Sequence, residues 1–120
     1  MFWRDSNIEC ILAYFGDQQF TVRIDKLRTG EIRYLCWRKS NSILERPSLI
    51  LRHGKISETS KDRTAYVFHH NDCTFTIERI VPKMEGAPNY FFIEVTDSVQ
   101  KKSTWKMEQM PIPKYFQNNF

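Results

Sequence analysis

The 120-residue chain contains only four glycines and three cysteines, and it has no apolar run of the length that crosses a membrane. A membrane-spanning helix needs about 20 consecutive apolar residues, so we expect no membrane association. The first 15 residues lack a basic segment, a long apolar stretch and a small-residue cleavage site, which argues against a signal peptide. We therefore expect a cytoplasmic protein, or a periplasmic one if a leader was removed ahead of Met1.

The cysteines also lack the spacing of a metal or redox site. Cys10, Cys36 and Cys73 lie in separate apparent strands, with no CxxC motif among them. An odd number of such cysteines is typical of small buried side chains in a reducing compartment. One disulfide with one free thiol is the alternative.

Catalytic signatures are missing as well. The chain has no GxSxG, no Walker loop, no GxGxxG and no paired carboxylates. Residues 69–73, HHNDC, form the one cluster of potential metal ligands, but adjacent residues at a strand end point to opposite faces. We interpret this cluster, and His53 beside Gly54, as turns. The sequence predicts no enzyme activity, no metal and no cofactor.

What the chain does have is a β-rich composition, with nine Phe, five Tyr and three Trp. Residues 64–80 show the clearest pattern, because apolar and polar side chains alternate on both sides of a polar turn at 70–72. Asn and Asp tolerate left-handed backbone angles. The stretch therefore predicts a β-hairpin.

The same patterning predicts further strands along the chain. We expect them at 8–15, 20–25, 31–39, 48–53, 55–59, 90–96 and 104–107. A short helical turn is expected at 43–45 before Pro47, an irregular link at 81–89, and a tail flanked by prolines at 111–120. Eight or nine short strands predict a single all-β domain over residues 1–120, an antiparallel meander that forms a small barrel or sandwich with little helix.

The net charge of +4 and the isoelectric point near 9.1 raise the possibility of nucleic-acid binding. Five cations alternate with aromatic residues in one region, and they could form a basic surface on which single-stranded bases stack: Arg33, Arg38, Lys39, Arg46 and Arg52, near Tyr34 and Trp37. In the alternative interpretation, the two aromatic residues are core and the arginines face water. Because 14 acidic residues are mixed among the 18 basic ones, we favour a mixed solvated surface.

A protein-binding surface is the remaining possibility. Trp3, Trp37, Trp105, Tyr115 and Phe116 exceed what a small core needs, although Trp3 and Trp105 could equally close an end of the barrel. Trp, Tyr and Arg dominate the energetics of protein interfaces. We predict a partner-binding site with five residues: Trp37, Arg38, Lys39, Arg46 and Trp105.

Three stretches define a layout of strands and turns over residues 43–102: SILERPSLILRHGKISE, AYVFHHNDCTFTIERI and YFFIEVTDSVQKK. This layout resembles that of small bacterial β-proteins of the inhibitor kind. It is similar to lysozyme-inhibitor-like barrels and to the immunity proteins that neutralise a toxin. The paired cysteines and Ser-Gly loop of lysozyme inhibitors are not evident here, so no inhibitory residue is assigned from them.

The resemblance implies a non-enzymatic antitoxin-like module that neutralises a toxin or enzyme by direct binding. A basic β-barrel that binds single-stranded nucleic acid and a periplasmic lysozyme-type inhibitor are the two alternatives. The net basic charge of the chain suits a protein partner that presents an acidic patch.

Overall fold

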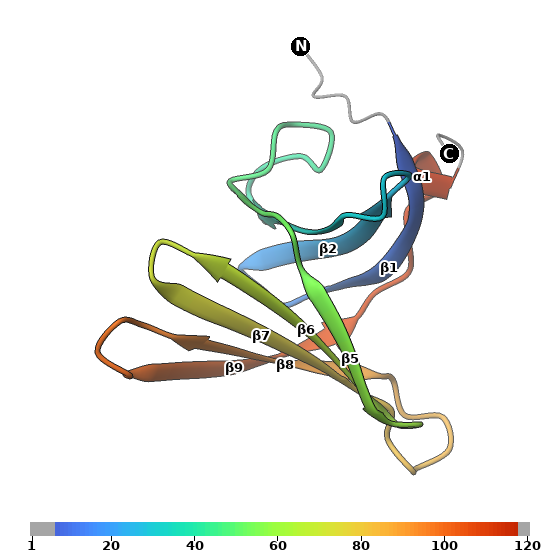
Figure 1. Cartoon of the computed structure of the whole chain (residues 1–120). Helices are drawn as coiled ribbons and strands as arrows, with labels where there is room; N and C mark the ends of the chain where they lie inside the picture. Colours follow the sequence, from blue (N-terminus) through green and yellow to red (C-terminus); the bar gives the residue numbers. More distant parts are fainter. Residues whose placement is uncertain (1–6, 118–120) are drawn as a thin grey trace.

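A computed structural model describes residues 7–117, and it is all-β (Figure 1). The nine strands and one four-residue helix follow in chain order: β1 (Ile8–Gly16), β2 (Phe20–Leu27), β3 (Ile32–Arg38), β4 (Leu49–Leu51), β5 (Lys55–Ser60), β6 (Arg63–His70), β7 (Cys73–Ile80), β8 (Tyr90–Thr96), β9 (Lys102–Gln109) and α1 (Lys114–Gln117). The predicted fold class is thereby confirmed. No helix within the described part of the chain is long and apolar enough to span a membrane.

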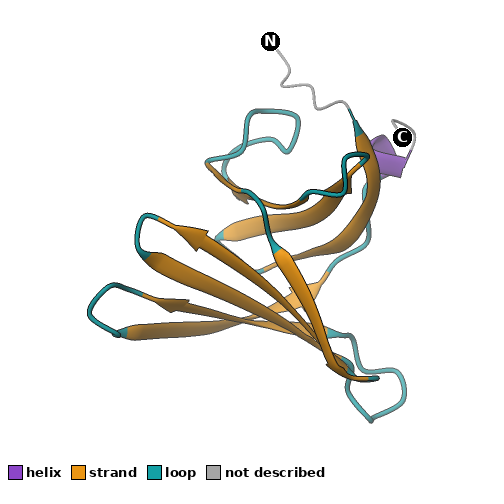
Figure 2. Ribbon diagram, in the orientation of Figure 1, coloured by secondary structure: helices purple, strands orange, loops and turns teal. Residues whose placement is uncertain are grey.

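All nine strands belong to one antiparallel sheet, in the order β4-β3-β2-β1-β9-β8-β7-β6-β5. The sheet curls strongly into a half-barrel whose two halves, β1–β4 and β5–β9, face each other (Figure 2). The halves are joined where Phe15 and Gly16 of β1 pair with Gln109 and Glu108 of β9. The two edge strands, β4 and β5, follow one another in the chain.

The predicted hairpin at 64–80 is confirmed. His70 pairs with Cys73, so the turn itself consists of Asn71 and Asp72, which have φ angles of 49° and 62°. Two consecutive residues with positive φ are the requirement of a type I′ turn, whose twist matches that of the flanking strands. The local sequence therefore sets the register of β6 against β7.

Two predicted segments differ in the structure. The strand expected at 48–53 has only three residues, because the chain turns at His53, whose φ is 56°. The proline-flanked tail contains α1, and Phe116 in this helix is buried. Residues 43–45 form a turn in which the Glu45 N–H donates to the Ser42 carbonyl at 3.0 Å.

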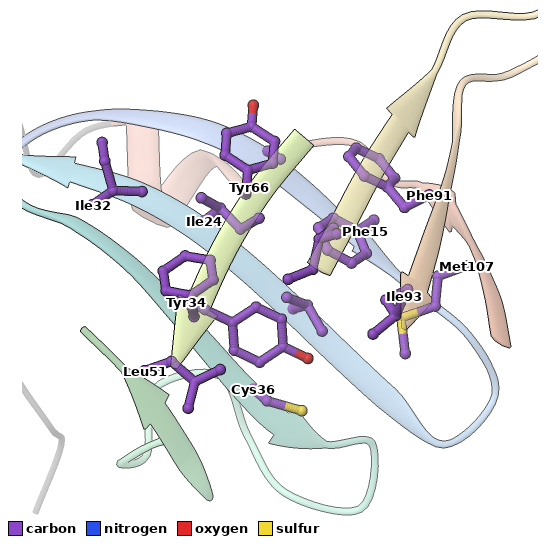
Figure 3. Packing of buried hydrophobic residues seen from close by; sticks show 14 residues of the cluster. Phe15, Ile24, Ile32, Tyr34, Cys36, Leu51, Tyr66, Phe91, Ile93 and Met107 are labelled. Atoms are coloured by element: carbon purple, nitrogen blue, oxygen red, sulfur yellow. The ribbon is translucent and has the colours of Figure 1, made fainter. Parts of the chain in front are cut away.

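The main core fills the concave face, between the two halves of the sheet (Figure 3). Alternate residues of β1–β4 and β6–β9 supply it, as the period of two requires. Phe15 stacks on Phe91 across the halves, with ring centroids 4.0 Å apart. The buried members are Ala13, Phe15, Val22, Ile24, Ile32, Tyr34, Cys36, Leu51, Tyr66, Phe68, Ile77, Phe91, Ile93 and Met107.

A second, smaller cluster covers the outer face of β1–β3. Tyr14, Leu35 and Trp37 point away from the main core and pack with Phe116 of α1. The rings of Tyr14 and Phe116 meet edge to face at 5.8 Å. Strands β2 and β3 are consequently buried on both faces.

Gly54, in the connection between the two edge strands, packs directly against the main core. Its N–H donates to the Ile32 carbonyl at 2.9 Å, and a Cβ at this position would collide with the buried ring of Phe68. The absence of a side chain thus lets the connection lie close against the core, next to the residues that turn the chain from β4 into β5.

Candidate functional site

Three of the five predicted partner-binding residues lie on one loop. Arg38 ends β3, Lys39 follows it, and Arg46 lies further along the connection to β4; all three side chains are exposed. The Lys39 N–H donates to the Gln19 carbonyl at 2.9 Å, and the Asn41 N–H donates to the Arg38 carbonyl at 2.9 Å. We call residues 38–46 the basic loop.

Trp37 supports the basic loop from below. Its side chain is only 1% exposed, and its indole N–H donates to the Glu45 carbonyl at 2.8 Å. A buried indole cannot be a contact residue on the surface, so this part of the predicted site needs correction. Trp37 holds the loop in place.

Trp105 does not join the loop. It lies on β9, in the other half of the sheet, and packs half-buried against the main core. This packing against the core is compatible with the alternative considered from the sequence, in which Trp105 closes an end of the barrel. The basic loop therefore retains Arg38, Lys39 and Arg46 as the predicted contact residues.

The basic aromatic surface expected for nucleic-acid binding does not form around β3. Tyr34 points into the main core and Trp37 into the second cluster, so neither ring can stack on a base at the surface. Arg33 is buried as well, and Arg52 pairs with Glu31. The interpretation of the two aromatic residues as core is confirmed, whereas Arg33 does not face water.

Sequence patterning also missed a buried ionic cluster on the outer face of β2 and β3. Asp25 lies opposite Arg33 in the strand register, and Arg23 lies two residues before it on the same face. Their exposed fractions are 0% for Asp25, 2% for Arg23 and 6% for Arg33. Arg33 donates through Nε to Oδ1 of Asp25 at 2.9 Å and through Nη2 to Oδ2 at 2.8 Å, and Arg23 Nε donates to Oδ2 at 3.0 Å.

This ionic cluster is connected to the support of the basic loop. The Arg23 guanidinium lies over the rings of Trp37 and Phe116, at 5.4 Å and 4.6 Å from their centroids. Such cation–π contacts strengthen when the cation is removed from water. The charge of Arg23 thereby links β2 to α1 and to the tryptophan under the loop.

A second, more exposed ion pair lies where β4 turns into β5. Arg52 donates to both carboxylate oxygens of Glu31, at 3.0 Å and 2.7 Å, and His53 Nδ1 lies 3.1 Å from Oε1. The hydrogen bond from Arg52 lowers the pKa of Glu31 below its ordinary value of 4.5, with smaller contributions from the charges of Arg52 and His53. The folded state therefore stabilises the ionised form of Glu31 over its protonated form.

We expect Glu31→Gln to make the free energy of unfolding depend less on pH in the acid range. A carboxyl whose folded-state pKa is depressed contributes stability above its unfolded pKa, here about 4.5, and loses it as pH falls through the folded-state pKa. Because Arg52 is exposed, we expect a contribution of about 1 kcal/mol or less at pH 7. Urea unfolding between pH 7 and pH 3 tests this: the wild-type protein should lose more stability than Glu31→Gln below pH 4.5, and parallel profiles would contradict it.

The three cysteines are all free thiols, so the disulfide alternative is not supported. Burial raises the pKa of Cys36 to about 11, and such a thiol is unreactive near neutral pH. His69 and His70 point to opposite faces of β6, and the His69 ring contacts the Thr74 hydroxyl at 3.2 Å. Within residues 7–117, no group of three His, Cys, Asp or Glu side chains is arranged to hold a metal ion.

Arg79 is a charged residue on the concave face. It lies two residues after Ile77, which belongs to the main core, so both side chains share one face of β7. Its Nε is buried and has no hydrogen-bond partner within the described residues. A buried donor without a partner costs about 1–3 kcal/mol, so this position calls for an explanation. Continuing the alternation of Cys73, Phe75 and Ile77 by one step would have found it from the sequence.

The convex face of β5–β9 carries mixed charges and partly exposed rings. In one cross-strand row, Phe92 lies between Glu78 and Lys106, and its side chain is 44% exposed. Tyr90 meets Phe92 edge to face, and Lys106 Nζ lies 4.5 Å from the Tyr90 ring centroid. One polar face is usual in an antiparallel sheet.

Comparisons of this chain with protein-family models, with curated proteins and with solved structures found no match.

Proposed function

We propose that the chain is a non-enzymatic protein-binding module that contacts an acidic partner through the basic loop. One observation supports this proposal above the others: three exposed cations lie on a single loop that is hydrogen-bonded at its base to a buried tryptophan. They are Arg38, Lys39 and Arg46.

The support of the loop matters for affinity. Ordering a flexible loop on binding costs free energy, and a loop already held in place avoids most of that cost. The Trp37 bond to Glu45 and the Lys39 bond to Gln19 fix both sides of the basic loop. Its cations would steer an acidic partner and set its orientation, because charges at the rim of an interface act mainly on the association rate and on specificity.

Within this class we propose a bacterial immunity or inhibitor role, in which the bound module blocks a toxin or enzyme. The resemblance of residues 43–102 to inhibitor-type β-proteins supports this choice, together with the nine-stranded sheet that carries the loop. The lysozyme-type alternative predicts that two of the three cysteines are bridged, whereas Cys10, Cys36 and Cys73 are free. The nucleic-acid alternative is less well supported, because Tyr34 and Trp37, the rings expected to stack on bases around β3, are buried.

The test is a pull-down from the source organism with the purified full chain, with and without nuclease, followed by mass spectrometry. It compares the wild-type protein with the triple variant Arg38→Ser, Lys39→Ser and Arg46→Ser. The control triple variant removes the same charge from exposed lysines elsewhere: Lys61→Ser, Lys83→Ser and Lys101→Ser.

We expect one stoichiometric polypeptide that survives nuclease and is retained by the wild-type protein and the control. The loop variant should bind it at least about tenfold more weakly, which corresponds to about 1.4 kcal/mol. Equal retention by the loop variant would contradict the assignment of the site. Retention of nucleic acid, with the protein partners lost after nuclease, would instead support the nucleic-acid alternative.

A further inference from the structure

A polar group interrupts the concave face at the end of β7. In the strand register, Glu58 of β5, Thr64 of β6, Arg79 of β7 and Phe91 of β8 follow one another in a single row. Tyr66 lies in the next row, diagonal to both Glu58 and Arg79. Side chains in this diagonal relation on one face are close enough for long residues to interact.

Arg79 has unused hydrogen-bonding capacity at this place. Its Nε is buried without a partner, and within residues 7–117 no carboxylate forms an ion pair with its guanidinium. The side chain as a whole is half-buried, so the guanidinium is not sealed in the core. The N–H groups of Arg79 can therefore donate hydrogen bonds to an acceptor from outside the described chain.

Tyr66 places a second donor at the border of the core, where its side chain is 4% exposed. Figure 3 shows its hydroxyl pointing away from the labelled core side chains, at the border of the cluster. Burial raises the pKa of Tyr66, while the charge of Arg79 lowers it and that of Glu58 raises it. The hydroxyl therefore stays protonated near neutral pH and lies within electrostatic range of Arg79.

We propose that this part of the concave face binds a small monocarboxylate that carries an apolar chain. Arg79 donates to the carboxylate through its guanidinium, whose fork of N–H groups matches two carboxylate oxygens. The Tyr66 hydroxyl donates a further hydrogen bond. The apolar chain lies on the exposed side of Ile56, which pairs with Tyr66 on the same face and is 44% exposed.

The local charge selects a singly charged ligand. Arg79 is one cation, and Glu58, which is exposed two strands away in the same row, opposes any anion there. A doubly charged phosphate would gain little from one guanidinium and would be repelled more strongly. A carboxylate needs only one positive partner, and its planar shape fits the guanidinium.

The experiment titrates the ¹⁵N-labelled full chain with octanoate and follows the amide NMR signals. We expect saturable shifts at Thr64, Tyr66 and Arg79, and no comparable shifts with octanol or with inorganic phosphate. Arg79→Met should weaken octanoate binding about tenfold or more, and Tyr66→Phe about threefold. Glu58→Gln should tighten it, because it removes the opposing charge.

The matched control is Arg63→Met, which removes an arginine from β6 that pairs with Glu78 at 3.5 Å. It should bind octanoate like the wild-type protein, and thermal unfolding would verify that each variant is folded. Octanoate binding that survives Arg79→Met, equal binding of octanol, or no saturable shift with octanoate would overturn the proposal. The triple variant of the basic loop should leave octanoate binding unchanged, so failure here is distinct from failure of the protein-binding function.

Discussion

Asp25→Asn is expected to lower the free energy of unfolding by about 3–5 kcal/mol. The Asp25 carboxylate accepts three hydrogen bonds from Arg23 and Arg33, and all three residues are buried. An amide keeps the shape of the side chain but brings no negative charge, and it turns one acceptor into a donor that faces an arginine. Two buried guanidinium groups would then lose the anion that lies between them.

Equilibrium urea unfolding of the two proteins measures this difference. The matched control is Glu94→Gln, which neutralises a carboxylate in a solvent-exposed pair, 3.4 Å from Lys102. Exposed pairs contribute about 0–1 kcal/mol, so the control should unfold almost like the wild-type protein. If Asp25→Asn changed stability as little as Glu94→Gln does, the ionic cluster would not hold β2 and β3 together.

The second half of the sheet could be predicted from sequence because its information is local. The turn residues Asn71 and Asp72 fix the hairpin, and alternation on both sides of them fixes which side chains face the core. The strand at 90–96 is confirmed for the same reason, as each of its faces has a distinct composition. Here one face is core and the other meets water.

The first half could not be predicted to the same depth, because a segment distant in the chain decides what is buried there. Arg23 and Asp25 alternate with apolar residues, which favours a solvent-facing side for β2. Phe116, about ninety positions later, packs over Arg23 at 4.6 Å and places that side in the interior. No local sequence pattern in β2 predicts that a distant helix packs over this face.

The same limit applies to the candidate sites. The exposed cations of the basic loop could be named from sequence, since Arg and Lys are rarely buried without partners. The supporting role of Trp37 could not, because it depends on the side of β3 that α1 and the loop cover. The alternation of side chains in β7 could have placed Arg79 on the concave face. That its Nε has no hydrogen-bond partner among residues 7–117 depends on the fold and could not be predicted from the sequence.

Trp37→Ala is expected to cost about 3–5 kcal/mol of stability, because it removes a large, fully buried side chain. The cavity would lie between Leu35, Phe116 and the basic loop, and the Glu45 carbonyl would lose its indole donor. Arg23 would also lose its contact with the Trp37 ring. Urea unfolding measures the total effect.

Trp37→Phe separates the two roles of the indole. Phenylalanine keeps much of the apolar volume but cannot donate to Glu45, so we expect a loss of about 1 kcal/mol from the hydrogen bond and some further loss from packing. If the tryptophan serves to hold the loop, partner binding measured on this folded variant should weaken although no contact residue has changed. Arg38→Ser should show the opposite pattern, with weaker binding at unchanged stability. Unchanged binding by Trp37→Phe would mean that the loop keeps its conformation without the indole bond.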